Sequence, residues 1–136
     1  PNLRFVGAHL GSMEWSVDEM AKHLDKFPNM ALDFAERVGH VQYQTIGDWQ
    51  KVHDFFIKYQ DRIIYGSDLQ EDETSNADTV KTIAHNLWVR DWQYFTSGDT
   101  LESPLVNGKF KGLMLPKTVI DKLYYKNAAK WYLNKY

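Results

Sequence analysis

The chain opens on an apolar run from Leu3 to His9, and this run constrains the fold more than any other segment. A nearly continuous apolar run with a histidine at its end is typical of a parallel strand whose faces are both covered and whose carboxyl end carries a side chain into a site. Its first hydrogen-bonding partner should lie upstream, where the sequence holds only Pro1 and Asn2. We therefore expect the chain to be the C-terminal part of a larger α/β protein.

Apolar runs and helical patterns alternate along the first half of the sequence and predict the order β-α-β-α-β. The expected strands are residues 3–9, 30–34 and 62–66. Ser16 and Glu19 form a capping box for a helix that stops at Pro28, and Asp48 can cap the next helix. We expect residues 36–47 to form a long irregular connection between the second strand and that helix.

The second half of the sequence is expected to be a loop over residues 69–78, a long helix ending near Tyr94, a small hairpin and a final helical region. Asn107-Gly108 is placed to turn the hairpin, and Asn127 to cap or break the final helices. The long helix should present one apolar face, made of Val80, Ile83, Ala84, Leu87 and Trp88. We expect residues 1–136 to form a single partial domain.

Charge and composition exclude several classes of partner. The chain carries 16 basic and 18 acidic side chains, a net charge of −2 that creates no field to attract phosphate backbones or anionic lipid. We therefore expect neither nucleic acid nor a membrane as partner. The absence of cysteine excludes disulfides and thiolate nucleophiles. The compartment stays unknown, with the cytoplasm as the default, because an N-terminal targeting signal is not observable here.

Polar side chains stand at the ends of all three expected strands: His9, Asp33 and Asp68. Ligands of parallel α/β sheets bind outside the carboxyl ends of the strands, so these residues are candidates for a site. Each also has a structural interpretation. His9 could hydrogen-bond a backbone carbonyl, Asp33 could cap a loop, and Asp68 could hold the turn after Gly66.

Familiar metal and nucleophile signatures are missing from the sequence. A catalytic zinc site uses about three protein ligands, and the chain has neither His-x-His nor His-Glu-x-x-His. The histidines at positions 23, 40, 53 and 85 are scattered. Gly66-Ser67-Asp68 lacks the glycine spacing of a nucleophile elbow.

Four motifs in order resemble the C-terminal half of the amidohydrolase-related family, the metal-dependent TIM-barrel hydrolases and decarboxylases. They are Ala8-His9-Leu10-Gly11, Phe27-Pro28-Asn29 leading to Asp33, Asp61-Arg62-Ile63-Ile64-Tyr65-Gly66-Ser67-Asp68, and Leu115-Pro116 with Tyr125-Lys126-Asn127-Ala128-Ala129. The resemblance covers essentially the whole chain. It implies that the three strands are the sixth, seventh and eighth of a (β/α)8 barrel, the N-terminal half of which is absent.

The resemblance also implies site residues. His9 falls on the sixth-strand histidine that orients or deprotonates a metal-bound water or polarises the substrate. Asp68 falls on the eighth-strand aspartate, a metal ligand in the intact protein that can also move a proton. Arg37 resembles an arginine after strand seven that could bind an anionic substrate group through a bidentate contact. Two residues after the eighth-strand aspartate the family often has a proline, and this chain has Gln70 instead.

These assignments imply a hydrolase acting on C–N or C–O bonds of a small molecule, or a related decarboxylase. In the intact protein a divalent metal, zinc or manganese, would activate water. The family's first-strand His-x-His and fifth-strand histidine have no counterpart here, so we expect no specific metal binding and no turnover from this chain alone. We also expect self-association through the sheet edge exposed at the first strand.

Two other functions are consistent with the residues. In the first, the chain is a non-catalytic interaction or binding module, and the polar strand ends are structural. His9 and Asp68 would then point into separate environments. In the second, Asp33 and Asp68 are a metal-independent carboxylate pair for glycoside hydrolysis, which needs a separation of about 5–9.5 Å.

Overall fold

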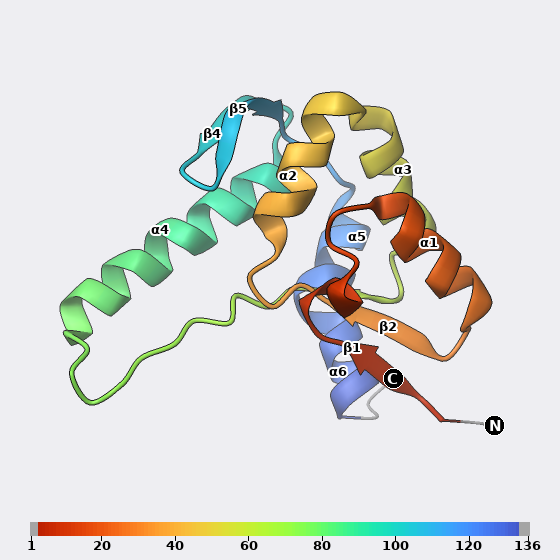
Figure 1. The fold of residues 1–136 in the computed structure, drawn as a ribbon, viewed down its shortest axis with the longest axis horizontal. Coiled ribbons are helices and arrows are strands. Elements are labelled where there is room, and N and C mark those ends of the chain that lie inside the picture. The colour runs from red at the N-terminus through yellow and green to blue at the C-terminus, as the bar shows by residue number, and fades with distance from the viewer. Residues whose placement is uncertain (1–2, 134–136) are drawn as a thin grey trace.

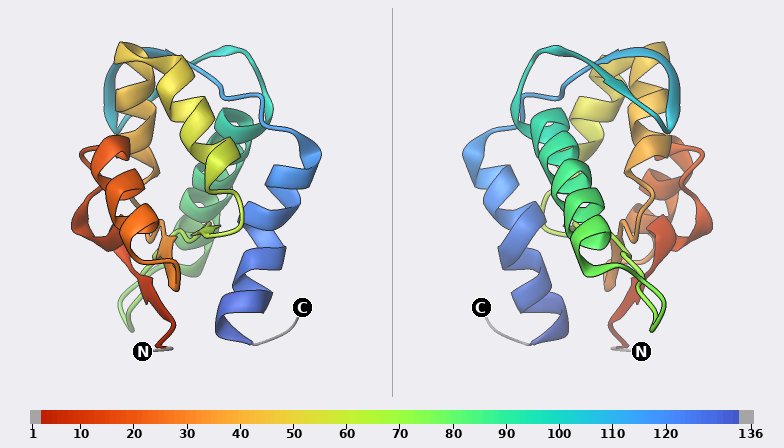
Figure 2. Two further views of the ribbon diagram at one scale, coloured as in Figure 1. Left: turned by 90° about the vertical axis from the view of Figure 1, so that its right-hand side faces the viewer. Right: turned by 90° about the vertical axis from the view of Figure 1, so that its left-hand side faces the viewer.

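The computed structural model describes residues 3–133, which fold into a mixed α/β arrangement (Figure 1). The strands are β1 (Phe5–Gly7), β2 (Met30–Asp33), β3 (Ile63–Ile64), β4 (Thr100–Ser103) and β5 (Val106–Lys111). The helices are α1 (Val17–Lys26), α2 (Val38–Gly47), α3 (Trp49–Lys58), α4 (Ala77–Thr96), α5 (Lys117–Asp121) and α6 (Asn127–Tyr132), with the short helical segments η1 (His9–Ser12) and η2 (Lys122–Lys126). Both views in Figure 2 place the N-terminal elements and the C-terminal helices on opposite sides of α3 and α4.

The central sheet has three parallel strands in the order β1-β2-β3. Phe5 pairs with Met30, and Leu32 pairs with Ile63. The prediction of three parallel strands is confirmed, although each strand is shorter than expected from residues 3–9, 30–34 and 62–66. Within residues 3–133 the sheet does not close into a barrel.

The strand β1 lies at an open edge of this sheet. It pairs with β2 on one side only within the described residues. Phe5 is 40% exposed, whereas Met30, Ala31 and Leu32 of β2 are buried. The expectation that the first strand is covered on both faces is therefore wrong for residues 3–133, while the expected open edge is present.

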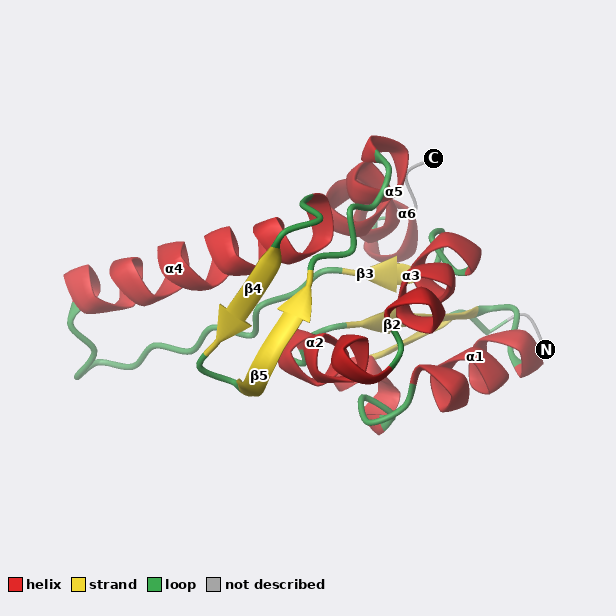
Figure 3. Cartoon of the chain, turned by 90° about the horizontal axis from the view of Figure 1, so that it is seen from above, coloured by secondary structure: helices red, strands yellow, loops and turns green. Residues whose placement is uncertain are grey.

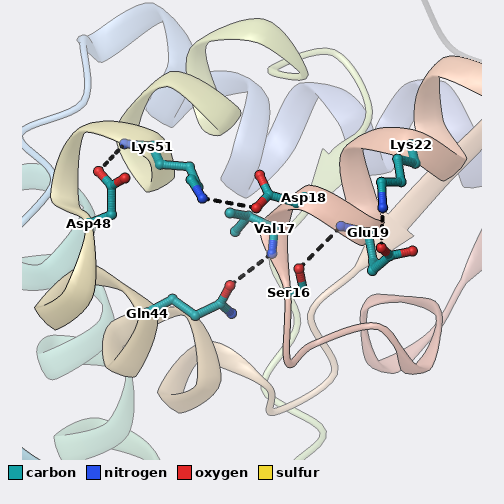
Figure 4. Close-up of polar contacts among 8 residues, drawn as sticks. All are labelled: Ser16, Val17, Asp18, Glu19, Lys22, Gln44, Asp48 and Lys51. Atoms are coloured by element: carbon teal, nitrogen blue, oxygen red, sulfur yellow. Dashed lines mark hydrogen bonds and ion pairs between the residues drawn. The ribbon is translucent and has the colours of Figure 1, made fainter.

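Side-chain caps fix the starts of α1 and α3, as the sequence predicts (Figure 4). The Ser16 hydroxyl accepts a hydrogen bond from the backbone N–H of Glu19 at 3.3 Å, and α1 ends at Lys26, before Pro28. The Asp48 carboxylate accepts from the backbone N–H of Lys51 at 3.0 Å. Each cap satisfies a backbone donor that the first helical turn leaves unpaired.

The irregular connection expected over residues 36–47 is wrong, because residues Val38–Gly47 form α2. Its buried residues recur at helical spacing: Val38, Val41, Gln42 and Thr45. The glycines and glutamines of this segment obscure the pattern in the sequence. One of them has a defined role, since the Gln44 side chain accepts from Val17 N and donates to Glu14 O, each at 2.8 Å.

The hairpin of β4 and β5 forms where it was expected but turns at other residues. Ser103 pairs with Val106, so the turn lies at Pro104-Leu105. Asn107-Gly108 lies inside β5 instead, with Gly108 at a φ of +119°. The expected turn position is therefore wrong. A local contact stabilises the observed turn instead, because the Ser103 hydroxyl accepts a hydrogen bond of 3.2 Å from Leu105 N.

The C-terminal helices form one continuous helical run through the π-helical segment η2. Asn127 has φ −68° and ψ −42°, so the expected cap or break at this position is wrong. Its buried side chain instead anchors the run to the beginning of β3, by donating to Gln60 O and Ile63 O. Tyr65 N adds a hydrogen bond of 2.9 Å to Leu123 O.

Aromatic rings fill the core between the sheet, α3 and α4. Phe34 stacks on Phe56 at 6.0 Å, and Phe95 packs edge-on against both. The expected apolar face of α4 is covered only in part, since Ala84 is buried but Ile83 and Trp88 are 55% and 50% exposed. Although α4 is the longest helix, no helix within residues 3–133 is long and apolar enough to cross a membrane.

Candidate active site

The carboxyl ends of the three parallel strands define the candidate site. Seen from above, β2 and β3 point the same way, toward the end of the sheet near α2 and α4 (Figure 3). His9 lies two residues after the end of β1, and Asp68 follows β3 through a short loop. Parallel pairing thus brings residues far apart in the sequence to one edge of the sheet.

His9 and Asp68 meet at this edge. His9 Nε2 lies 3.9 Å from Asp68 Oδ2, and their side chains are 39% and 38% exposed. This separation is longer than a direct hydrogen bond but close enough for the carboxylate to stabilise an imidazolium. Because both side chains are partly exposed, solvent and a ligand can reach them, and the two lie next to each other at the sheet edge.

Left-handed backbone conformations follow every strand of the sheet. His9 after β1 has a φ of 52°, Ala35 and Glu36 after β2 have 39° and 75°, and Asp68 after β3 has 48°. Such conformations are costly for residues other than glycine and are concentrated at functional sites. The strand ends that carry the candidate residues are therefore also where the chain holds local strain.

The turn after β1 is the most unusual of these segments. His9, Leu10, Gly11 and Ser12 all have positive φ, between 52° and 65°. Leu10 is fully buried and anchors the turn against the core. His9 Nδ1 is buried without a hydrogen-bond partner among the described residues. The turn thus fixes the backbone of His9 while leaving its ring nitrogens free of protein hydrogen bonds.

Asp33 makes no hydrogen bond or ion pair with His9 or Asp68 among the described residues. Its Oδ2 accepts a hydrogen bond of 2.7 Å from the Tyr132 hydroxyl of α6. A Cβ atom at Gly66 would lie 2.8 Å from Asp33 Oδ1, so glycine is what allows this close approach. Burial, and then Asp33, raise the pKa of Tyr132. Asp33 therefore has a structural partner that connects β2 to the C-terminal helix.

Arg37 lies beside acidic groups at the start of α2. Its guanidinium is 3.0 Å from Glu36 Oε2 and 4.0 Å from Glu14 Oε1. Together with Glu36, His40 and Tyr43 it lines a cavity of about 300 Å³. Its proposed contact with an anionic substrate group stays a prediction.

Asp68 lines a larger cavity, of about 550 Å³. The other lining residues come from the segment after β2, the loop after β3, α4 and the hairpin turn: Glu36, Ser67, Leu69, Gln70, Ile83, Asn86, Leu87, Arg90 and Leu105. Apolar walls with a few charged groups are typical of small-molecule sites.

A buried polar cluster behind this cavity was missed in the sequence. Asp91 is only 2% exposed, accepts a hydrogen bond of 3.0 Å from the Tyr65 hydroxyl, and lies 3.9 Å from Arg90 Nε. Burial raises the pKa of Asp91 to about 6, against the opposing effects of Tyr65 and Arg90. The sequence does contain a signal for this cluster, because Asp91 follows Ala84 and Leu87 at helical spacing and so lies on the apolar side of the helix.

The donor set near His9 falls short of a complete metal site. A catalytic zinc site uses about three protein ligands and an open position. His9 and Asp68 supply two donors, and residues 3–133 contain no group of three histidine, cysteine or carboxylate side chains that could hold a metal ion. The two residues therefore fit part of a ligand set only.

A family model described as amidohydrolase matches residues 1–133, which include the ends of all three parallel strands. No curated protein and no solved structure matches the chain.

Proposed function

Because the chain belongs to the amidohydrolase family, we propose that His9 and Asp68 are catalytic residues of a hydrolase or related decarboxylase that acts on a small molecule. The single observation that carries the proposal is the approach of His9 Nε2 to Asp68 Oδ2, at 3.9 Å, across the carboxyl edge of the sheet. An interaction module has no need for these two groups to converge.

In the proposed roles, His9 accepts a proton from the attacking water and Asp68 stabilises the imidazolium that results. Imidazole suits this task because it accepts and releases protons near neutral pH. Asp68 would also be a ligand of a divalent metal, zinc or manganese, which supplies Lewis-acid activation of water when bound. Since residues 3–133 supply only these two donors at the site, we expect the chain alone to lack turnover.

Calorimetry with zinc and with manganese tests the incomplete ligand set. We expect no saturable site on this chain, because two donors do not satisfy a catalytic metal. A site of micromolar affinity that disappears in both His9→Ala and Asp68→Asn would contradict this part of the proposal.

The decisive assay uses the full-length product of the reading frame that carries this sequence, supplied with zinc or manganese. Hydrolysis of amides, esters and lactones, and decarboxylation of aromatic acids, would be measured. His9→Ala and Asp68→Asn should each lower kcat by about a hundredfold or more, as removal of an acid–base group does. His85→Ala, on the exposed surface of α4, is the matched control and should retain activity. Unchanged kcat in both site variants would refute the proposal.

A further inference from the structure

The Asn107-Gly108 pair does not form the hairpin turn that its sequence predicts. The turn lies at Pro104-Leu105, and the pair lies inside β5, where both residues are exposed. Asn107 is also the only asparagine of the sequence that is followed by glycine. The pair therefore combines an exposed side-chain amide with the least hindered backbone nitrogen that can follow it.

The backbone of this pair lies in a bulge of β5. Two ladder pairs flank the bulge: Ser103 with Val106, and Leu101 with Phe110. Between them, residues 107–109 of β5 are opposite the single residue Glu102 of β4, so regular pairing is interrupted there. All three bulge residues are exposed. Gly108 thus lies outside the paired positions of the hairpin.

The side chain of Asn107 is not held in place by polar contacts. Its amide makes no hydrogen bond to any residue in the range 3–133. Gly108 has a φ of +119°, and a Cβ added to it would meet only the Ile46 side chain, at 3.4 Å. No side chain at Gly108 shields its backbone nitrogen. The Asn107 amide is therefore free to turn toward this nitrogen.

We infer that Asn107 deamidates spontaneously in the folded chain, through a cyclic imide formed with Gly108. The backbone nitrogen of Gly108 loses its proton and attacks the side-chain carbonyl carbon of Asn107. A new C–N bond forms, and the side-chain amino group leaves as ammonia. Water then opens the ring at either of its two carbonyl carbons, which gives aspartate or isoaspartate. Water is the only co-reactant.

The modification adds a charge to a cavity. Asn107 lines the cavity of about 300 Å³ together with Glu36 and Arg37. Conversion replaces a neutral amide by a group that is ionised at neutral pH. Arg37 already has Glu36 and Glu14 as acidic neighbours, at 3.0 Å and 4.0 Å, and the product adds another carboxylate to the wall of the same cavity. The inference is independent of the proposed function, because it needs neither substrate nor metal.

Incubation of the folded chain at neutral pH, followed by proteolysis and mass spectrometry of the peptides, tests the modification. The Asn107 peptide should gain the mass of an amide-to-acid exchange, incorporate oxygen from isotopically labelled water, and contain isoaspartate. Asn86, exposed on α4 and followed by Leu87, is the control within the same molecule. It should convert about tenfold or more slowly, because a branched side chain hinders the attacking nitrogen and each tenfold corresponds to a barrier higher by about 1.4 kcal/mol.

The same incubation in urea measures the rate in the unfolded chain. Since the bulge leaves the pair unrestrained, conversion of Asn107 in the folded chain should stay within about tenfold of the unfolded rate. A larger slowing in the folded chain would overturn the inference, and so would equal conversion of Asn107 and Asn86. Asn107→Gln should abolish the signal at this position, because a longer side chain disfavours the ring. Isoaspartate that persists in this peptide would contradict the cyclic imide.

Asn107→Asp reproduces one product and tests where the new charge lies. The Nε–H resonance of Arg37 in NMR spectra should shift in this variant. Asn76→Asp is the matched control, because aspartate keeps the cap of α4 and position 76 does not line this cavity, and it should leave the resonance in place. Circular dichroism confirms that each variant is folded. An Arg37 resonance that responds to neither variant would overturn the placement of the charge beside Arg37.

Discussion

The side-chain amide of Asn127 donates a hydrogen bond of 2.8 Å to the carbonyl oxygen of Ile63, which joins α6 to the beginning of β3. The same amide donates to Gln60 O at 2.7 Å, and Asn127 is only 2% exposed. A side chain from the C-terminal helices thus satisfies backbone acceptors beside the third strand. The loop that carries Asp68 begins a few residues further on.

Asn127→Ala should therefore destabilise the fold. Two carbonyl oxygens would lose their donor, and one of these hydrogen bonds is buried, so the free energy of unfolding should fall by roughly 2–4 kcal/mol. Urea unfolding followed by circular dichroism measures it. Asn86→Ala, on the exposed surface of α4, is the matched control and should stay within about 0.5 kcal/mol of wild type. Equal stability of the two variants would contradict the anchoring role.

Gly11→Ala should destabilise the left-handed turn that carries His9. Gly11 has a φ of +65°, and an added Cβ would lie 2.9 Å from the Met13 side chain. The left-handed conformation alone costs about 1–2 kcal/mol for a residue with a Cβ. Gly47→Ala in α2 is the opposite case, since a Cβ there meets nothing within 4 Å, and it should stabilise by about 0.4–1 kcal/mol. Thermal unfolding of both variants gives the comparison, and the same sign for both would rule out the argument.

The open edge at β1 should cause association between copies of the chain. Unpaired backbone groups and apolar side chains at an edge invite strand pairing, and Leu3 and Phe5 are 74% and 40% exposed. Size-exclusion chromatography should show a mass that rises with concentration. Phe5→Lys should shift the equilibrium toward monomer, whereas Lys109→Ala in the β4–β5 hairpin should not. A monomer at every concentration would count against the prediction.

The strands and caps could be predicted because their signals are local. The run Met30-Ala31-Leu32 and the pair Ser16 and Glu19 carry their structure in adjacent residues. The helix α2 was missed because its buried positions include the polar residues Gln42 and Thr45. These residues are buried through packing against other elements, which a local apolar pattern does not indicate. Thr45 and Tyr94, for example, share a buried hydrogen bond of 2.6 Å that no local pattern indicates.

Some residues of the candidate site could likewise be predicted from the sequence, and others could not. His9 and Asp68 follow recognisable strands, so the edge where they meet could be expected from sequence. Arg90 and Asp91 were missed because they lie within the apolar pattern of α4, and Tyr65, the hydrogen-bond partner of Asp91, comes from the segment after β3. Only the packing of α4 against that segment shows that Asp91 is buried and that Arg90 faces the cavity.

The buried carboxyl group of Asp91 should make stability depend on pH in a direction opposite to ordinary acid denaturation. Burial raises its pKa from 3.8 to about 6, so the folded state binds this proton more tightly than the unfolded state. The stabilising contribution is therefore complete below pH 3.8 and is lost as pH rises through about 6, a change of about 3 kcal/mol for two pKa units.

Asp91→Asn tests this directly, because asparagine cannot ionise but keeps an oxygen for the Tyr65 hydroxyl. Urea unfolding of both proteins across pH should show the variant gaining stability relative to wild type between about pH 4 and about pH 7, by up to about 3 kcal/mol. Taking the difference at each pH cancels the titration of every other carboxylate. Tyr65→Phe should raise the pKa of Asp91 further and move the wild-type transition to higher pH, because the hydrogen bond it removes favours the charged form. A difference between wild type and Asp91→Asn that is constant with pH would show that Asp91 does not titrate in this range.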